Sequence, residues 1–114
     1  MLRAYDLQPD GTVKNMRVYV NFYPGRSADG IAIDSHGNVY AAAGLNASRG
    51  TSETLDTKPG IHVFNPKGER INYILIPEDT ITNVCFGGPD LRTCFVTAGK
   101  SLYKFPVDVP GTRR

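Results

Sequence analysis

Apolar and polar residues alternate in short runs along this chain, with the period of two that is typical of β-strands. In the stretch SADGIAIDSHGNVYAAAG, at residues 27–44, two such runs flank a Ser-His-Gly-Asn turn. Similar runs predict strands near residues 2–6, 15–21, 30–34, 38–42, 61–65, 70–76, 82–86, 93–98 and 102–105. The pattern indicates an all-β chain in which helices are scarce.

Turn residues separate these runs, and the pattern of strands then repeats. QPDGT at 8–12, DSHGN at 34–38, NPKGE at 65–69 and GGPD at 87–90 supply the Gly, Pro, Asn and Asp of tight reversals. When residues 29–44 are laid over residues 82–99, Ile31 matches Val84 and Ile33 matches Phe86. Four-stranded antiparallel units that recur after about 40 to 50 residues are typical of β-propeller blades.

The predicted strands amount to about two blades within one partial propeller domain, residues 1–114. We assign an outer hairpin of one blade to residues 1–22, a complete blade to 28–77 and the start of the next blade to 81–106. Propellers typically close with four to eight blades. We therefore expect the remaining blades to come from a longer parent polypeptide or from association of several copies, and a start in the middle of a blade favours the first.

Composition and charge exclude several classes of protein. Thirteen basic and eleven acidic residues are interleaved along 114 residues, so no basic stripe suited to nucleic acid is present. No apolar run reaches the length of about 20 residues that a bilayer requires. The first residues, MLRAYDLQPD, lack the order of a signal peptide. We expect a soluble chain with no membrane or nucleic-acid partner, in a compartment that the sequence leaves open.

The cysteines and histidines form no evident chemical site. If the hairpin FGGPDLRT places residue 86 opposite 93, then Cys85 faces Cys94 and a cross-strand disulfide is geometrically feasible. The alternative is two reduced core thiols, because free Cys often behaves as a small buried hydrophobe. His36 and His62 have no partners of metal-site or triad spacing, and we expect them at the surface or on an edge strand.

Five segments together resemble the closing blades of the gluconolactonase, or senescence marker protein, family, which includes regucalcin. They are LRAYDLQPDGTV, ADGIAIDSHGNVYAAAG, GIHVFNPKGE, TNVCFGGPDLRTCFVTA and SLYKFPVDVPG, and they cover almost the whole chain. The resemblance implies a six-bladed propeller with one divalent metal ion in its central channel. It further implies metal-dependent hydrolysis of a sugar lactone or similar cyclic ester, with calcium as the expected ion and zinc as the alternative.

The resemblance also implies a role for Asp29 as metal ligand and general base, since it matches the Asp of the family's Pro-Asp-Gly step at the head of an innermost strand. Here Ala28 stands where the family usually has Pro. An Asp before Gly is also an ordinary turn residue whose side chain bonds to backbone amides. Asn83, at the place equivalent to Gly30, is a candidate for lining the channel, whereas Asp34 is expected to serve the hairpin turn.

The family's remaining metal ligands belong to blades outside this chain, so we expect little lactonase activity from the chain alone. The alternative function is a noncatalytic propeller module that binds ligands or partners at the same mouth. The long connection at residues 44–60 is rich in Gly, Ser and Thr and lies at that end of the blade. It is a candidate lid, or else a simple surface insertion.

Overall fold

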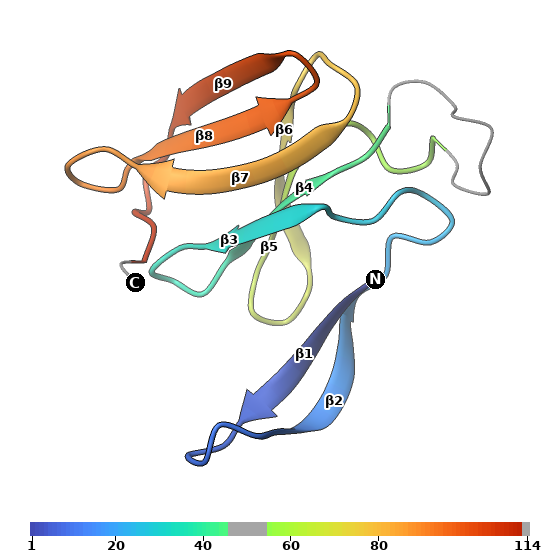
Figure 1. The fold of residues 1–114 in the computed structure, drawn as a ribbon, viewed down its shortest axis with the longest axis vertical. Coiled ribbons are helices and arrows are strands. Elements are labelled where there is room, and N and C mark those ends of the chain that lie inside the picture. Colours follow the sequence, from blue (N-terminus) through green and yellow to red (C-terminus); the bar gives the residue numbers. More distant parts are fainter. Residues whose placement is uncertain (46–54, 113–114) are drawn as a thin grey trace.

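The computed structural model describes residues 1–45 and 55–112, and in this part of the chain nine strands form three antiparallel sheets (Figure 1). The strands are β1 (Leu2–Leu7), β2 (Val13–Val20), β3 (Gly30–Ile33), β4 (Val39–Ala43), β5 (Gly60–Phe64), β6 (Arg70–Leu75), β7 (Ile81–Gly87), β8 (Thr93–Ala98) and β9 (Ser101–Pro106). All nine predicted strands are present, and each end lies within two residues of its expected position. The described residues contain no helix long and apolar enough to span a membrane.

Each sheet is a meander of strands that follow one another in the chain, ordered β1-β2, β3-β4-β5-β6 and β7-β8-β9. The turn between β3 and β4 shows how local chemistry sets such a reversal. Asp34 is buried there and accepts hydrogen bonds of 2.9 Å from the backbone N–H groups of His36 and Asn38. Gly37 adopts a φ of 80°, which favours glycine. The expected turn role of Asp34 is confirmed.

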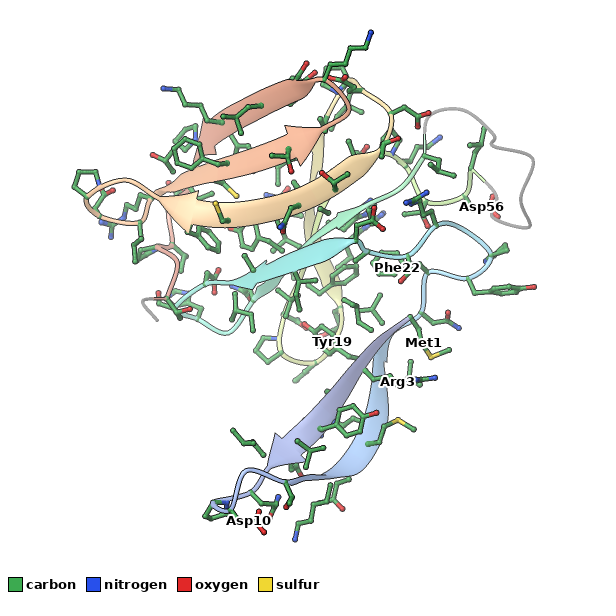
Figure 2. The ribbon with its side chains drawn as sticks, in the orientation of Figure 1. Met1, Arg3, Asp10, Tyr19, Phe22 and Asp56 are labelled. Carbon is green, nitrogen blue, oxygen red and sulfur yellow. The ribbon has the colours of Figure 1, made fainter. Side chains whose placement is uncertain are left out.

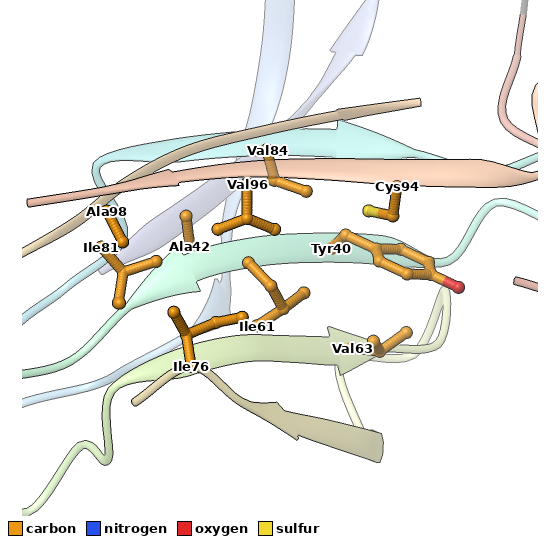
Figure 3. Close-up of a cluster of buried hydrophobic side chains, with 10 residues drawn as sticks. All are labelled: Tyr40, Ala42, Ile61, Val63, Ile76, Ile81, Val84, Cys94, Val96 and Ala98. Carbon is orange, nitrogen blue, oxygen red and sulfur yellow. The ribbon is translucent and has the colours of Figure 1, made fainter. Parts of the chain in front are cut away.

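The core lies between the second and third sheets (Figure 3). On β4, β5 and β8 its side chains come from alternate positions, so one face of each strand points inward. Ile76 and β7 complete it, with Ile81 and Val84 on either side of a register irregularity in β7. The rings of Tyr40 and Phe86 pack in a T-shaped arrangement, with ring centroids 4.9 Å apart. Each fully buried aliphatic side chain contributes about 1.5–3 kcal/mol of hydrophobic stabilisation. The cluster comprises Tyr40, Ala42, Ile61, Val63, Ile76, Ile81, Val84, Cys94, Val96 and Ala98.

The β1-β2 hairpin extends away from the other two sheets, with Asp10 near its tip (Figures 1 and 2). It joins the second sheet through aromatic contacts: Tyr19 and Phe22 lie 6.4 and 5.8 Å from the ring of Phe64. The Tyr19 hydroxyl also donates to the carbonyl of Asn65. Much of the rest of the hairpin is uncovered among the described residues, including the exposed side chains of Tyr5, Leu7, Val13, Met16 and Val18.

The two cysteines lie on opposite faces of their hairpin, so the disulfide alternative is wrong. The register pairs Phe86 with Cys94 and Cys85 with Phe95, one residue away from the pairing that a disulfide requires. Successive side chains of a strand point to opposite faces, and Cys94 is therefore buried while Cys85 is exposed. Burial raises the pKa of the Cys94 thiol to about 12. Both cysteines are free thiols, and only Cys94 belongs to the core.

His62 is buried, which corrects the expectation of a surface or edge position. It lies on β5, which is paired on both sides by β4 and β6, and only 2% of its surface is exposed. One ring nitrogen, Nε2, lies 2.8 Å from the Lys58 carbonyl, and the Tyr73 ring is 4.8 Å away. Burial lowers the pKa of His62 because it disfavours the charged imidazolium. His36, by contrast, is exposed as expected.

Candidate functional site

Asp29 lies at the entrance to β3, the edge strand of the four-stranded sheet. Its backbone N–H donates to the carbonyl of Ala42 on β4 at 2.9 Å, which extends the pairing of the two strands by one step. The side chain is 33% exposed. A carboxylate in this position is fixed by its backbone and remains accessible to a small ligand.

Arg26 neutralises this carboxylate, a contact that the sequence analysis missed. Its Nη2 atom donates to Asp29 Oδ2 at 3.0 Å, and its side chain is only 19% exposed. The pair therefore lies partly shielded from solvent, where ion pairs are screened less than at a fully exposed surface. The signal in the sequence was a basic residue three positions before the carboxylate, which is too common to single out a site.

Thr57 packs against Gly25, at the start of the segment that carries Arg26 and Asp29. Gly25 is buried and donates its N–H to the carbonyl of Phe22 at 2.8 Å. A Cβ atom at Gly25 would lie 2.1 Å from Thr57 Oγ1, so only glycine allows this approach. Contacts of this kind fix the turn although Ala28 replaces the Pro that is usual in the family.

Asn83 lies beside Asp29 on the neighbouring sheet. It follows a register irregularity near the start of β7, and its Oδ1 accepts a 2.8 Å hydrogen bond from the Val84 N–H. A Cβ atom at Gly30 would lie 2.2 Å from the same oxygen. The Asn83 side chain therefore packs directly on the residue that follows Asp29, and the structure brings the two predicted site residues to adjacent strand entrances.

Other connections meet at this end of the sheets. Leu45 donates its N–H to the Thr57 carbonyl at 3.3 Å, which closes the base of the 44–60 loop. The middle of that loop lies outside the described residues, so its role as a lid stays a prediction.

Glu78, before β7, accepts hydrogen bonds from the Lys100 N–H and the Tyr103 hydroxyl at 2.8 and 2.9 Å. These hydrogen bonds, led by the one from Lys100, lower the pKa of Glu78.

Farther along β3 and β7, the two strands line a cavity of about 540 Å³. Most of the residues that line it are apolar, and Cys85 contributes a thiol. Its lining consists of Ile31, Ala32, Ile33, Val84, Cys85, Phe86, Leu91 and Thr112.

The described residues suit a hard divalent cation in chemistry but supply too few ligands. Asp29 carries carboxylate oxygens and Asn83 an amide oxygen, which are ligand types that calcium prefers. No group of three or more His, Cys, Asp or Glu side chains in the described ranges could hold an ion. Calcium takes six to eight oxygen ligands. In a calcium site built on these two side chains, the other ligands would have to come from outside the described residues.

Comparison with known proteins places these features in one family. The family model described as the SMP-30/Gluconolactonase/LRE-like region matches residues 1–100. Regucalcin of Danio rerio is 27% identical over 94 residues, which is 82% of this chain and 28% of regucalcin. The chain thus spans less than a third of that relative's length.

Two solved structures share the fold. An X-ray structure of a gluconolactonase-family protein superposes with a TM-score of 0.76 and 28% identity, over 98% of this chain and 33% of the other. A luciferin-regenerating enzyme superposes with a TM-score of 0.74 and 22% identity, over 96% of this chain and 39% of the other, and shows the fold alone. The expected fold class, antiparallel blades of a partial six-bladed β-propeller, is confirmed. From the family match over residues 1–100 and the shared fold, we conclude that this chain belongs to the SMP-30/gluconolactonase/LRE-like family.

Proposed function

We propose that this chain is part of a metal-dependent hydrolase of sugar lactones or related cyclic esters, in which Asp29 is a metal ligand and the general base. The observation that carries the proposal is the placement of Asp29. It is an accessible carboxylate at the head of the edge strand β3, beside the Asn83 amide. Membership of a family that includes gluconolactonase supports the reaction class.

In this proposal Asp29 would hold a divalent ion, expected to be calcium with zinc as the alternative, and the ion when bound would supply Lewis-acid polarisation of the ester carbonyl and of a water. Asp29 accepts a proton from the attacking water as its oxygen bonds to the carbonyl carbon. The ring carbon–oxygen bond then breaks, and the departing oxygen takes up the proton held by Asp29, which gives the open hydroxy acid and restores the Asp29 carboxylate. Asn83 serves as a hydrogen-bond donor to the bound lactone through its amide nitrogen.

The proposal requires partners for the uncovered strands of this chain. Val84 faces the second sheet and is 3% exposed, whereas its repeat counterpart Ile31 is 46% exposed. Beside Ile31, a groove of about 330 Å³ separates β3 and β4 from the β1-β2 hairpin. We propose that the inner hairpin of the first blade fills this groove and that further blades of a longer polypeptide enclose the channel. Assembly from several copies is the alternative.

Measuring the mass of the purified chain in solution separates the two sources. Light scattering that shows a discrete assembly of about three chains would support self-assembly, because about two blades per chain then give about six. A monomer or a heterogeneous aggregate supports blades supplied by a longer polypeptide, since unpaired edge strands promote association without a fixed stoichiometry.

The test of the function is Asp29→Asn in the polypeptide or assembly that completes the channel. We expect divalent-ion binding, measured by calorimetry, to weaken, and hydrolysis of an aldonolactone to fall about 100-fold or more. Asp90→Asn, at an exposed turn residue, is the matched control and should change neither. Hydrolysis that survives Asp29→Asn would refute the assignment of the base.

A noncatalytic binding module remains the second candidate, because Arg26 already occupies one oxygen of Asp29. The same variant distinguishes the two functions. A binding module would bind a sugar lactone equally well with Asp or Asn at position 29 and would hydrolyse it in neither form.

A further inference from the structure

We infer that Arg26 competes with a divalent cation for the carboxylate of Asp29, and so controls how readily this mouth of the propeller takes up an ion. The inference deepens the proposed function and rests on it, since that function makes Asp29 a cation ligand. Arg26 then acts as a positioning residue, which holds the carboxylate while the ion is absent.

The competition follows from the geometry of one oxygen. The guanidinium nitrogen of Arg26 lies 3.0 Å from Asp29 Oδ2. A calcium-sized ion binds a carboxylate oxygen at about 2.3–2.6 Å. A guanidinium and a doubly charged ion on the same oxygen would be like charges in close contact, and the repulsion is only partly screened at a site with a 19% exposed arginine. Arg26 therefore has to release Oδ2 when an ion binds there.

The backbone keeps Arg26 close to the carboxylate. Gly25, immediately before it, is packed on Thr57 with no space for a side chain. Asp29 is tied to Ala42 by a 2.9 Å backbone hydrogen bond. Because both ends of this short turn are held, the backbone keeps Arg26 within reach of Asp29 Oδ2.

The chain also contains a matched comparison pair. Arg17 donates to Asp6 over the same distance of 3.0 Å, but on the protruding hairpin, where the two side chains are 59% and 47% exposed. Arg17→Gln therefore removes the same charge from the protein without touching Asp29. It separates a local effect of Arg26 from a change in net charge.

The test is a titration of the ¹⁵N-labelled full chain with Mn²⁺ alone, in which paramagnetic broadening of the Asp29, Gly30 and Asn83 amide signals reports binding. We expect Arg26→Gln to lower the Mn²⁺ concentration for half-broadening about threefold to tenfold, the scale of one partly exposed charge pair. Arg26→Lys should restore much of the wild-type value, since it keeps the positive charge. This variant therefore separates loss of the charge from misfolding as the cause of the effect of Arg26→Gln.

Arg17→Gln should leave the half-broadening concentration at Asp29 within twofold of wild type, and Asp29→Asn should abolish the broadening. Equal titrations of wild type and Arg26→Gln, or an equal shift in Arg17→Gln, would overturn the inference. If wild type and Arg26→Gln titrate equally but Asp29→Asn abolishes the broadening, the inference about Arg26 fails while Asp29 remains a ligand, as the proposed function requires. Absence of broadening at these amides in every variant would also overturn the inference, while lactone hydrolysis by Asp29→Asn tests the function separately.

Discussion

Replacing Gly30 with Ala should push Asn83 out of the candidate site. The new Cβ atom would lie 2.2 Å from Asn83 Oδ1, 2.8 Å from its Cγ and 3.0 Å from its Cα. Ordinary van der Waals contact begins near 3.4 Å, so the amide side chain has to turn away and give up its hydrogen bond with the Val84 N–H. Such overpacking costs about 1–3 kcal/mol.

An opposing effect reduces this cost. Ala restricts the unfolded chain more than Gly does, which stabilises the folded state by about 0.4–1 kcal/mol where the backbone accepts it. We expect a net loss of about 1.5 kcal/mol in the free energy of unfolding. Urea denaturation followed by far-UV circular dichroism measures it as a lower midpoint with an unchanged slope.

A double-mutant cycle tests the assigned contact. Asn83→Ala removes Oδ1 and Cγ, the two atoms nearest to the added methyl group, but leaves Cα at 3.0 Å. In that background Gly30→Ala should therefore cost about 1 kcal/mol less than in the wild type. Free-energy changes that simply add, or a Gly30→Ala variant within about 0.5 kcal/mol of wild type, would refute the packing of Asn83 on Gly30.

Three further predictions follow from buried groups. Asp34→Ala should lower the free energy of unfolding by about 2–3 kcal/mol in urea denaturation, because it leaves the two part-buried turn N–H groups of His36 and Asn38 without their acceptor. A loss below about 0.5 kcal/mol would contradict this. The pKa of His62 is lower in the folded than in the unfolded chain, so its contribution to the free energy of unfolding should be fully present above about pH 6.5 and fall as the pH decreases below that value. His62→Gln should flatten this dependence in melting curves from about pH 7.5 to 5, and His36→Gln should not. A thiol reagent should label Cys85 in the native chain and reach Cys94 only in denaturant, because burial raises the pKa of Cys94 to about 12; native labelling of both would contradict the register of β7 and β8.

The candidate site was only partly predictable from the sequence. Asp29 was identified through the family resemblance, because it matches the Asp of the Pro-Asp-Gly step at the head of an innermost strand, and Asn83 because the repeat aligns it with Gly30. Arg26 was not identified, since an arginine three residues from an aspartate has many outcomes in a loop. Its contact with Oδ2 depends on the packing of Gly25 against Thr57, which lies about thirty residues farther along the chain.

The sequence by itself determined the strands and their turns. Alternation of apolar residues and the conformations of Gly, Asn and Asp act over a few neighbours, and all nine strands were accordingly predicted to within two residues. Tertiary structure alone decided which faces are covered. A shift of one residue in the β7-β8 pairing placed Cys85 and Cys94 on opposite faces, and strands on both sides of β5 buried His62. Burial of this kind depends on segments distant in the sequence, which is why no local pattern could reveal it.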